Sequence, residues 1–209
     1  ASTPEAFADR EVELGTGTLT VTDHGTMASC REVYDLAKKR GLTPIVGLEG
    51  YLRDDHCPVL DKFGISTPEA VKEYSKYSHV TINYLDQKAY EVGCRILSEA
   101  DARAERHGSE YKPIFNWAQL EELGQENVTI GSSCLAGVVQ RHLTLERFDI
   151  AKAYYEKLRS VVKPGNFFVE VFPHRCDKFW VKGIFLQLEG QTEKTKGGAG
   201  KKLRVDIEG

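Results

Sequence analysis

The strongest constraint on this chain is a β-branched apolar run that stops at a carboxylate, an imidazole and a glycine. Residues 18–22 read Thr-Leu-Thr-Val-Thr, which suits a largely covered strand, and Asp23, His24 and Gly25 follow at once. Groups at the carboxyl ends of strands line the ligand crevice of α/β proteins, so we expect chemistry at this strand end. The alternative is that Asp23 caps the next helix and His24 is an exposed loop imidazole.

The remaining pattern alternates strands and helices, which predicts an α/β fold. A helix from Thr26 to Gly41 would join the strands at 18–22 and 43–51 into a βαβ unit with parallel strands. Further strands are predicted over 77–85, 127–134 and 166–174. Further helices are predicted over 3–15, from Thr67, over 86–107 and 116–123, through Val138 and Val139, and over 145–162.

The character of the sequence changes at Asp177. Residues 179–188 are aromatic and aliphatic, residues 191–200 are a low-complexity Lys/Thr/Gly stretch, and residues 201–207 are a basic strand candidate. This pattern predicts a C-terminal β-hairpin with a flexible turn. We therefore divide the chain into a β/α domain over 1–176 and a β extension over 177–209.

Composition narrows the function classes. The net charge is −3, which argues against a nucleic-acid clamp over a whole face and restricts any DNA contact to a local site. No apolar run approaches the ~20 residues of a membrane span, and no signal peptide is recognisable, so we expect a cytoplasmic protein with no membrane partner. The chain starts without methionine on a helix-start signature, and we expect it to be part of a longer protein.

The cysteines argue for a reducing environment. Their number is odd, and no C-x-x-C pair occurs, which is unlike a disulfide framework or a zinc ribbon. We expect reduced thiols at all five positions: Cys30, Cys57, Cys94, Cys134 and Cys176.

Four polar groups are associated with the predicted strands: His24, Glu49, His79 and Cys134. Imidazole, carboxylate and thiolate are the ligands that divalent transition metals select, so their joint placement predicts a metal site. Each has an ordinary alternative, because Glu49 fits a surface carboxylate, His79 a satisfied core histidine and Cys134 a small buried hydrophobe.

Five motifs in order carry a specific resemblance. They are TDHGTM (22–27), PIVGLEGY (44–51), HVT (79–81), SSCLAG (132–137) and FFVEV (167–171). Over about residues 1–176 the chain resembles the polymerase and histidinol phosphatase (PHP) domain at the start of the bacterial DNA polymerase III alpha subunit, of bacterial or phage origin. The resemblance implies a distorted (β/α)7 barrel, incomplete in this chain, with up to three metals at the carboxyl ends of its strands.

The resemblance also implies roles for single residues. His24, Glu49, His79 and Cys134 fall on metal-ligand positions, and Asp23 falls on the acid beside the ligand histidine, where it would orient the site. Asp23 and His24 are therefore the candidate catalytic residues. His174 lies in a segment where the family often has a histidine and is a further candidate ligand. The implied cofactors are zinc, manganese or iron ions, with magnesium as another candidate.

The function implied is metal-dependent phosphoester hydrolysis at DNA or nucleotide 3′ ends, as an exonuclease or phosphatase beside a polymerase. Implied partners are the remainder of the polymerase chain and other replisome subunits. Two motifs of the family, an opening His-x-His strand and a closing Asp-x-His strand, are not found, since Asp206 is followed by Ile207 and Glu208. This leaves open a catalytically eroded scaffold that braces the polymerase or binds a proofreading partner, and implies weak or no activity in this chain. A free-standing histidinol-phosphatase-like enzyme is a third reading.

Overall fold

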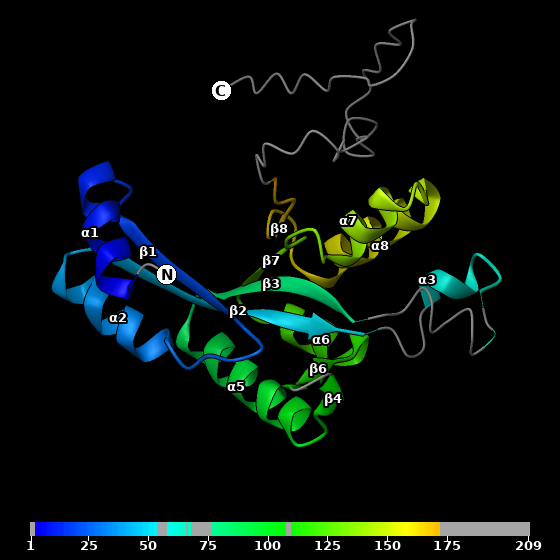
Figure 1. Ribbon diagram of the computed structural model, residues 1–209, viewed down its shortest axis with the longest axis horizontal. Coiled ribbons are helices and arrows are strands. Elements are labelled where there is room, and N and C mark those ends of the chain that lie inside the picture. Colours follow the sequence, from blue (N-terminus) through cyan, green and yellow to red (C-terminus); the bar gives the residue numbers. More distant parts are fainter. Residues whose placement is uncertain (1–2, 54–57, 66, 68–76, 108–109, 172–209) are drawn as a thin grey trace, which may run out of the picture.

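Within the part of the chain that the structure describes, a mixed sheet of six strands lies at the centre, with helices on both sides of it (Figure 1). The computed structural model describes residues 3–53, 58–65, 67, 77–107 and 110–171. The strands of the central sheet are β1 (Thr18–His24), β2 (Thr43–Leu52), β3 (Ser78–Tyr84), β6 (Ile114–Phe115), β7 (Val128–Gly131) and β8 (Phe167–Phe168). The helices are α1 (Pro4–Leu14), α2 (Cys30–Lys39), α3 (Pro58–Asp61), α5 (Gln87–Asp101), α6 (Trp117–Gly124), α7 (Val138–Thr144) and α8 (Phe148–Val161). This composition confirms the predicted α/β class.

The strand order is β1-β2-β3-β7-β8, and β6 pairs with β2. In the view of Figure 1, α1 and α2 lie at the left end of the sheet, α5 and α6 lie below β2 and β3, and α7 and α8 lie above them. The predicted βαβ unit is confirmed, because β1 and β2 are parallel and α2 packs on both. In this register His24 lies opposite Glu49.

The amino end of α1 follows its sequence signals, whereas that of α2 does not. The Thr3 side chain accepts a hydrogen bond from the Ala6 amide at the start of α1. The predicted start of this helix at Thr26 is wrong, because α2 begins at Cys30, after its N-cap residue Ser29. The Thr26 hydroxyl instead accepts from the Ala28 amide at 3.2 Å, a local turn that competes with the helix start.

Strand β3 runs antiparallel to both of its neighbours, β2 and β7. The resemblance places the metals at the carboxyl ends of the strands, which implies that adjacent strands are parallel, and for β3 this expectation is wrong. Leu52, the last residue of β2, pairs with Ser78, the first residue of β3, so β3 begins where β2 ends. His79, near the start of β3, therefore lies opposite Tyr51, near the end of β2.

The predicted helix over 86–107 is too long. Asp86 caps α5 as expected, accepting from the Ala89 amide at 2.8 Å, but the helix ends at Asp101. Strands β4 (Glu105–His107) and β5 (Glu110–Lys112) then pair as an antiparallel hairpin. The Gly108-Ser109 dipeptide between them is of the type that favours such hairpins, and this signal was overlooked.

Later elements are shorter than predicted. The helix predicted from 145 begins at Phe148, because Glu146 has a positive φ of 57° that interrupts helical backbone. Strand β7 stops at Gly131, and β8 covers only two of the described residues 166–171 within the strand predicted over 166–174. His174, most of the short helix predicted from Thr67, and the hairpin over 177–209 lie outside the described residues.

Among the described residues, two separate apolar clusters stabilise the fold. The main core lies between the middle of the sheet and α5 to α8, and its fully buried members include Leu48, Ile82, Ile96, Leu120, Ile130, Tyr154 and Leu158. The N-terminal core lies between α1, β1 and α2, and consists of Ala8, Leu19, Val33, Ala37 and Leu42. Strand β2 contacts elements of both regions.

Two expectations from composition bear on the described residues. Cys30, Cys94 and Cys134 are free thiols, as predicted, while Cys57 and Cys176 lie outside the described part. No helix in that part of the chain is both long and apolar enough to cross a bilayer.

Candidate metal centre

Three predicted ligands converge at one edge of the sheet. His24 is the last residue of β1, Glu49 lies opposite it in β2, and His79 is the second residue of β3. One donor atom from each lies within 4.8 Å of the others. The antiparallel direction of β3 makes this possible, because its amino end meets the carboxyl ends of β1 and β2.

Glu49 connects the two histidines. Its Oε2 atom lies 2.7 Å from His24 Nε2, and its Oε1 atom lies 2.9 Å from His79 Nδ1. The side chain of His24 is 60% exposed, whereas those of Glu49 and His79 are 12% and 15% exposed. The cluster is therefore open to solvent on the His24 side and closed by protein behind Glu49.

The environment of Glu49 favours its charged form. Burial alone raises the pKa of this carboxyl. Hydrogen bonds from His79 and Ser133, together with the charges of His79 and His24, outweigh burial and lower the pKa to about 2. Glu49 is thus a carboxylate at neutral pH, which is the form that binds cations.

Cys134 is the fourth predicted ligand, and its sulfur lies beside the cluster. Its Sγ atom is 3.3 Å from His79 Nδ1 and accepts a hydrogen bond from the Ala136 amide at 3.4 Å. Burial, followed by the negative charge of Glu49, raises the pKa of the thiol despite this backbone hydrogen bond. A bound cation would reverse this balance, because a metal binds the thiolate and releases the proton.

Ser133, next to this cysteine, also contacts the cluster, although no motif in the sequence marks it as a site residue. The Ser133 hydroxyl donates to Glu49 Oε1 at 2.7 Å, and the Ser133 amide donates to Glu170 Oε1 at 2.9 Å. Ser133 has a left-handed φ of 63°. No sequence signal reveals this backbone conformation at a serine, so the contact could only be found in the structure.

Asp23 lies next to His24 but turns toward α2. Its Oδ2 atom accepts hydrogen bonds from the amide of Ser29, at 3.1 Å, and from the Ser29 hydroxyl. Asp23 therefore fixes the loop between His24 and α2 and orients the backbone that carries His24, whereas the N-cap residue of α2 is Ser29. Its part in catalysis stays a prediction, as does that of His174, which lies outside the described residues.

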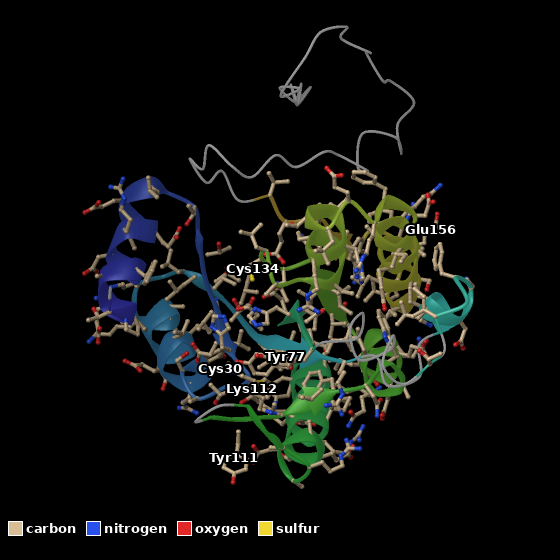
Figure 2. All side chains as sticks on the ribbon, turned by 45° about the vertical axis from the view of Figure 1, so that its right-hand side comes forward. Cys30, Tyr77, Tyr111, Lys112, Cys134 and Glu156 are labelled. Atoms are coloured by element: carbon tan, nitrogen blue, oxygen red, sulfur yellow. The ribbon has the colours of Figure 1, made fainter. Side chains whose placement is uncertain are left out.

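An aromatic wall borders His79. The Tyr51 ring contacts the His79 ring edge to face, with centroids 5.3 Å apart. Lys112 Nζ lies 4.5 Å from the centroid of the Tyr51 ring and 5.7 Å from that of the Tyr77 ring, and Figure 2 shows Lys112 and Tyr77 next to each other. Gly25 leaves room for this wall, since a Cβ atom there would come within 2.5 Å of the Tyr51 ring.

The donor set fits a divalent transition metal. Two imidazoles, a carboxylate and a thiol lie close together, and four such donors match the coordination of zinc-like ions. The low pKa of Glu49 keeps one donor charged, and the exposed side of His24 gives access for an ion and a substrate.

Comparison with known proteins gives the same family from a family model and from single relatives. The PHP domain family matches residues 1–174. The DNA polymerase III subunit alpha of Saccharopolyspora erythraea is 31% identical over 167 residues, covering 74% of this chain and 13% of that protein. The corresponding subunit of Mycobacterium tuberculosis is 31% identical over 169 residues, with 78% and 14% covered, and that of Helicobacter pylori is 29% identical over 177 residues, with 80% and 13% covered. The chain thus spans about an eighth of the length of these relatives.

Proposed function

Because the chain belongs to the PHP domain family, we propose that it is the PHP domain of a replicative DNA polymerase of the DNA polymerase III alpha type. The relatives described above, each a DNA polymerase III subunit alpha, support this assignment. On this proposal the central sheet is part of a distorted (β/α)7 barrel over residues 1–176, and 177–209 form an extension. The partners are the remainder of the polymerase chain, DNA and other replisome subunits, and the setting is the cytoplasm.

The activity we propose is metal-dependent hydrolysis of phosphoesters at DNA 3′ ends. The observation that carries it is the convergence of His24, Glu49 and His79 within 4.8 Å, with Cys134 beside His79. A zinc, manganese or iron ion bound there would lower the pKa of a bound water and polarise a phosphoryl oxygen.

The contacts of each side chain suggest its role. Glu49 is the buried anchor, held as a carboxylate by Ser133 and His79. His79 is packed between Tyr51 and Glu49, which fixes its ring. His24 is the most exposed donor, so it borders the space from which a phosphoester would approach. Asp23 holds the backbone behind His24 through Ser29.

The proposal is tested by metal binding and hydrolysis in parallel. The 209-residue chain is stripped with chelator, titrated calorimetrically with Mn²⁺ and Zn²⁺, and then incubated with a DNA oligonucleotide labelled near its 3′ end. Wild type should bind a metal and release 3′ nucleotides only when loaded, and only slowly, because the two family motifs that are not found in this chain would supply further ligands. Glu49→Gln should lose both properties, because it removes the charged anchor. The matched control is Glu126→Gln, a partly buried carboxylate paired with Lys88, which should retain both.

The outcomes separate the candidate functions. Metal binding that needs Glu49 but gives no hydrolysis would contradict the enzyme and support a scaffold that braces the polymerase or holds a proofreading partner. Hydrolysis that survives in Glu49→Gln would show that the active site lies elsewhere or that a contaminating nuclease is present.

A further inference from the structure

The turn after β7 is held in a conformation that its own residues do not favour. It comprises Ser132, Ser133 and Cys134, and Ser133 adopts a φ of 63°. Left-handed backbone is unfavourable for a residue with a side chain, and it persists only where the surroundings enforce it. The turn delivers two groups to the candidate metal centre: the Ser133 hydroxyl, which reaches Glu49, and the Cys134 sulfur, which reaches His79.

Glu170 holds the turn in this conformation through two hydrogen bonds. Its Oε1 atom accepts from the Ser133 amide at 2.9 Å, and its own amide donates to the Ser132 hydroxyl at 3.0 Å. The segment that contains Glu170 and the turn after β7 are therefore joined by two hydrogen bonds, one donated from each side. A charged acceptor makes a stronger hydrogen bond to an amide than a neutral one.

Gln140 also holds the turn, from the segment that follows it in the sequence. Its Nε2 atom donates to the Ser132 hydroxyl at 2.6 Å and to the Ser133 carbonyl at 3.1 Å. Gln140 lies near the start of α7. This helix follows the turn in the sequence, whereas β7 precedes it. The turn is thus fixed by side chains from two separate segments.

Gly131 makes room for the Glu170 carboxylate. A Cβ atom at this position would lie 2.1 Å from Glu170 Oε1, so any side chain would displace the carboxylate from the Ser133 amide. This gives a second way to disturb the same contact without touching Glu170.

We infer that Glu170 is a positioning residue for the metal centre, which holds Cys134 within reach of an ion bound by His24, Glu49 and His79. Glu170 is not among the donors that lie within 4.8 Å of one another in the described residues, so it acts through the turn. The inference rests on the proposed function for the identity of the centre, but the contact between Glu170 and the turn can be tested without metal.

The first test uses Co²⁺ as a spectroscopic probe of the thiolate. Wild-type chain loaded with Co²⁺ should show the near-ultraviolet charge-transfer absorption of a cobalt–thiolate bond, and Cys134→Ser should lack it. Glu170→Ala and Gly131→Ala should still bind Co²⁺ but lose most of this absorption. Glu170→Gln, which retains an oxygen acceptor, should recover it. A thiolate band of wild-type intensity in Glu170→Ala would overturn the inference.

The second test uses the metal-free protein. The rate at which iodoacetamide alkylates Cys134 is followed by mass spectrometry, with the partly buried Cys94 as internal reference. Loss of the hydrogen bond from the Ser133 amide should speed alkylation of Cys134 by about tenfold in Glu170→Ala, with little change at Cys94. Glu170→Gln should stay near wild type. Unchanged Cys134 reactivity would overturn the inference.

The two tests separate the two failures. If wild type binds no Co²⁺, the proposed metal function fails, and the alkylation rates alone decide whether Glu170 holds the turn. If Co²⁺ binds with a thiolate band that no Glu170 or Gly131 variant alters, the metal function stands and the positioning role falls.

Discussion

At the scale of single residues, Glu49 connects the candidate centre because both of its oxygens are used. Oε2 contacts His24, and Oε1 contacts His79 and the Ser133 hydroxyl. Its folded pKa of about 2 lies below the ordinary value of 4.5. The stabilisation from these contacts is therefore fully present above about pH 4.5 and is lost as the pH falls from there toward 2.

A second titrating residue predicts a pH effect nearer to neutrality. His142 is fully buried and stacked on Tyr154, with ring centroids 5.2 Å apart. Burial, with the charges of Arg147 and Arg141, lowers its pKa to about 4. The unfolded chain binds the proton first as the pH falls, so stability should decrease between about pH 6.5 and 4, by roughly 2 kcal/mol from pH 7 to 5.

The measurement is urea denaturation of wild type and His142→Phe at pH 7 and pH 5. Phenylalanine retains a ring on Tyr154 but has no proton to bind, so the variant should lose roughly 2 kcal/mol less than wild type over this range. Equal losses in the two proteins would show that His142 is not the source of the pH dependence.

The sequence identifies the residues that would bind a metal better than the residues that hold them in position. His24, Glu49 and Cys134 were recognisable because each lies where a predicted strand ends, a position that side-chain alternation reveals. Ser133 and Glu170 were not assigned, because their contact joins residues 37 positions apart through a left-handed serine. Neither a long-range contact nor that backbone angle leaves a local pattern in the sequence.

At the scale of elements, α6 is specified by its amino end. Asn116 accepts from the Gln119 amide at 2.9 Å, and the Gln119 side chain accepts from the Asn116 amide at 3.2 Å, which is a complete capping box. The helix places Trp117, Leu120 and Leu123 in the main core. The cap thus fixes the position at which these apolar side chains enter the core.

Removing the cap should cost stability without changing the fold. Asn116→Ala should lower the free energy of unfolding by about 1 kcal/mol, because the Gln119 amide loses its acceptor. Asn116→Ser, which keeps a capping oxygen, should lose clearly less. Guanidinium denaturation of the two variants gives the comparison, and equal losses would mean that the side-chain cap is not what stabilises this end of α6.

Local signals predicted several elements but not their directions. The β1-α2-β2 unit followed from periodicity, because a helical crossover between two strands forces them to be parallel. The direction of β3 depends on which end of β2 pairs with its first residue, and no short pattern in the sequence encodes this. The end of α5 was also mispredicted, because helical spacing continued into residues that pair as the β4-β5 hairpin.

At the scale of the whole molecule, the two cores predict two levels of stability. The N-terminal core has five buried residues, whereas the main core has many more. Regions with little buried apolar surface open at lower free energy. In metal-free protein, hydrogen exchange followed by mass spectrometry should therefore show faster exchange in α1 and α2 than in α5 and α8. Equal rates would mean that the cores unfold as one unit.

A bound metal should reduce the difference in hydrogen-exchange rate between the N-terminal core and the main core. His24 comes from β1 in the N-terminal core, whereas His79 and Cys134 lie on elements packed around the main core. Adding Zn²⁺ or Mn²⁺ should slow exchange in α1 and α2 more than in α8, and His24→Ala should abolish this effect. Neither core could be assigned from the sequence, because periodicity shows which face of an element is buried but not which partner covers it.

The candidate donors lie on both sides of the boundary between the two cores. Ion binding and closure of the N-terminal region should therefore favour each other. An ion that needs donors from both sides binds only while the N-terminal region is closed, so its apparent dissociation constant rises as the inverse of the closed fraction. Leu19→Ala removes buried surface from the N-terminal core and touches no donor, yet a variant opened in this way would lose metal affinity. By the same linkage, metal supply would set how much of this domain is folded at any moment.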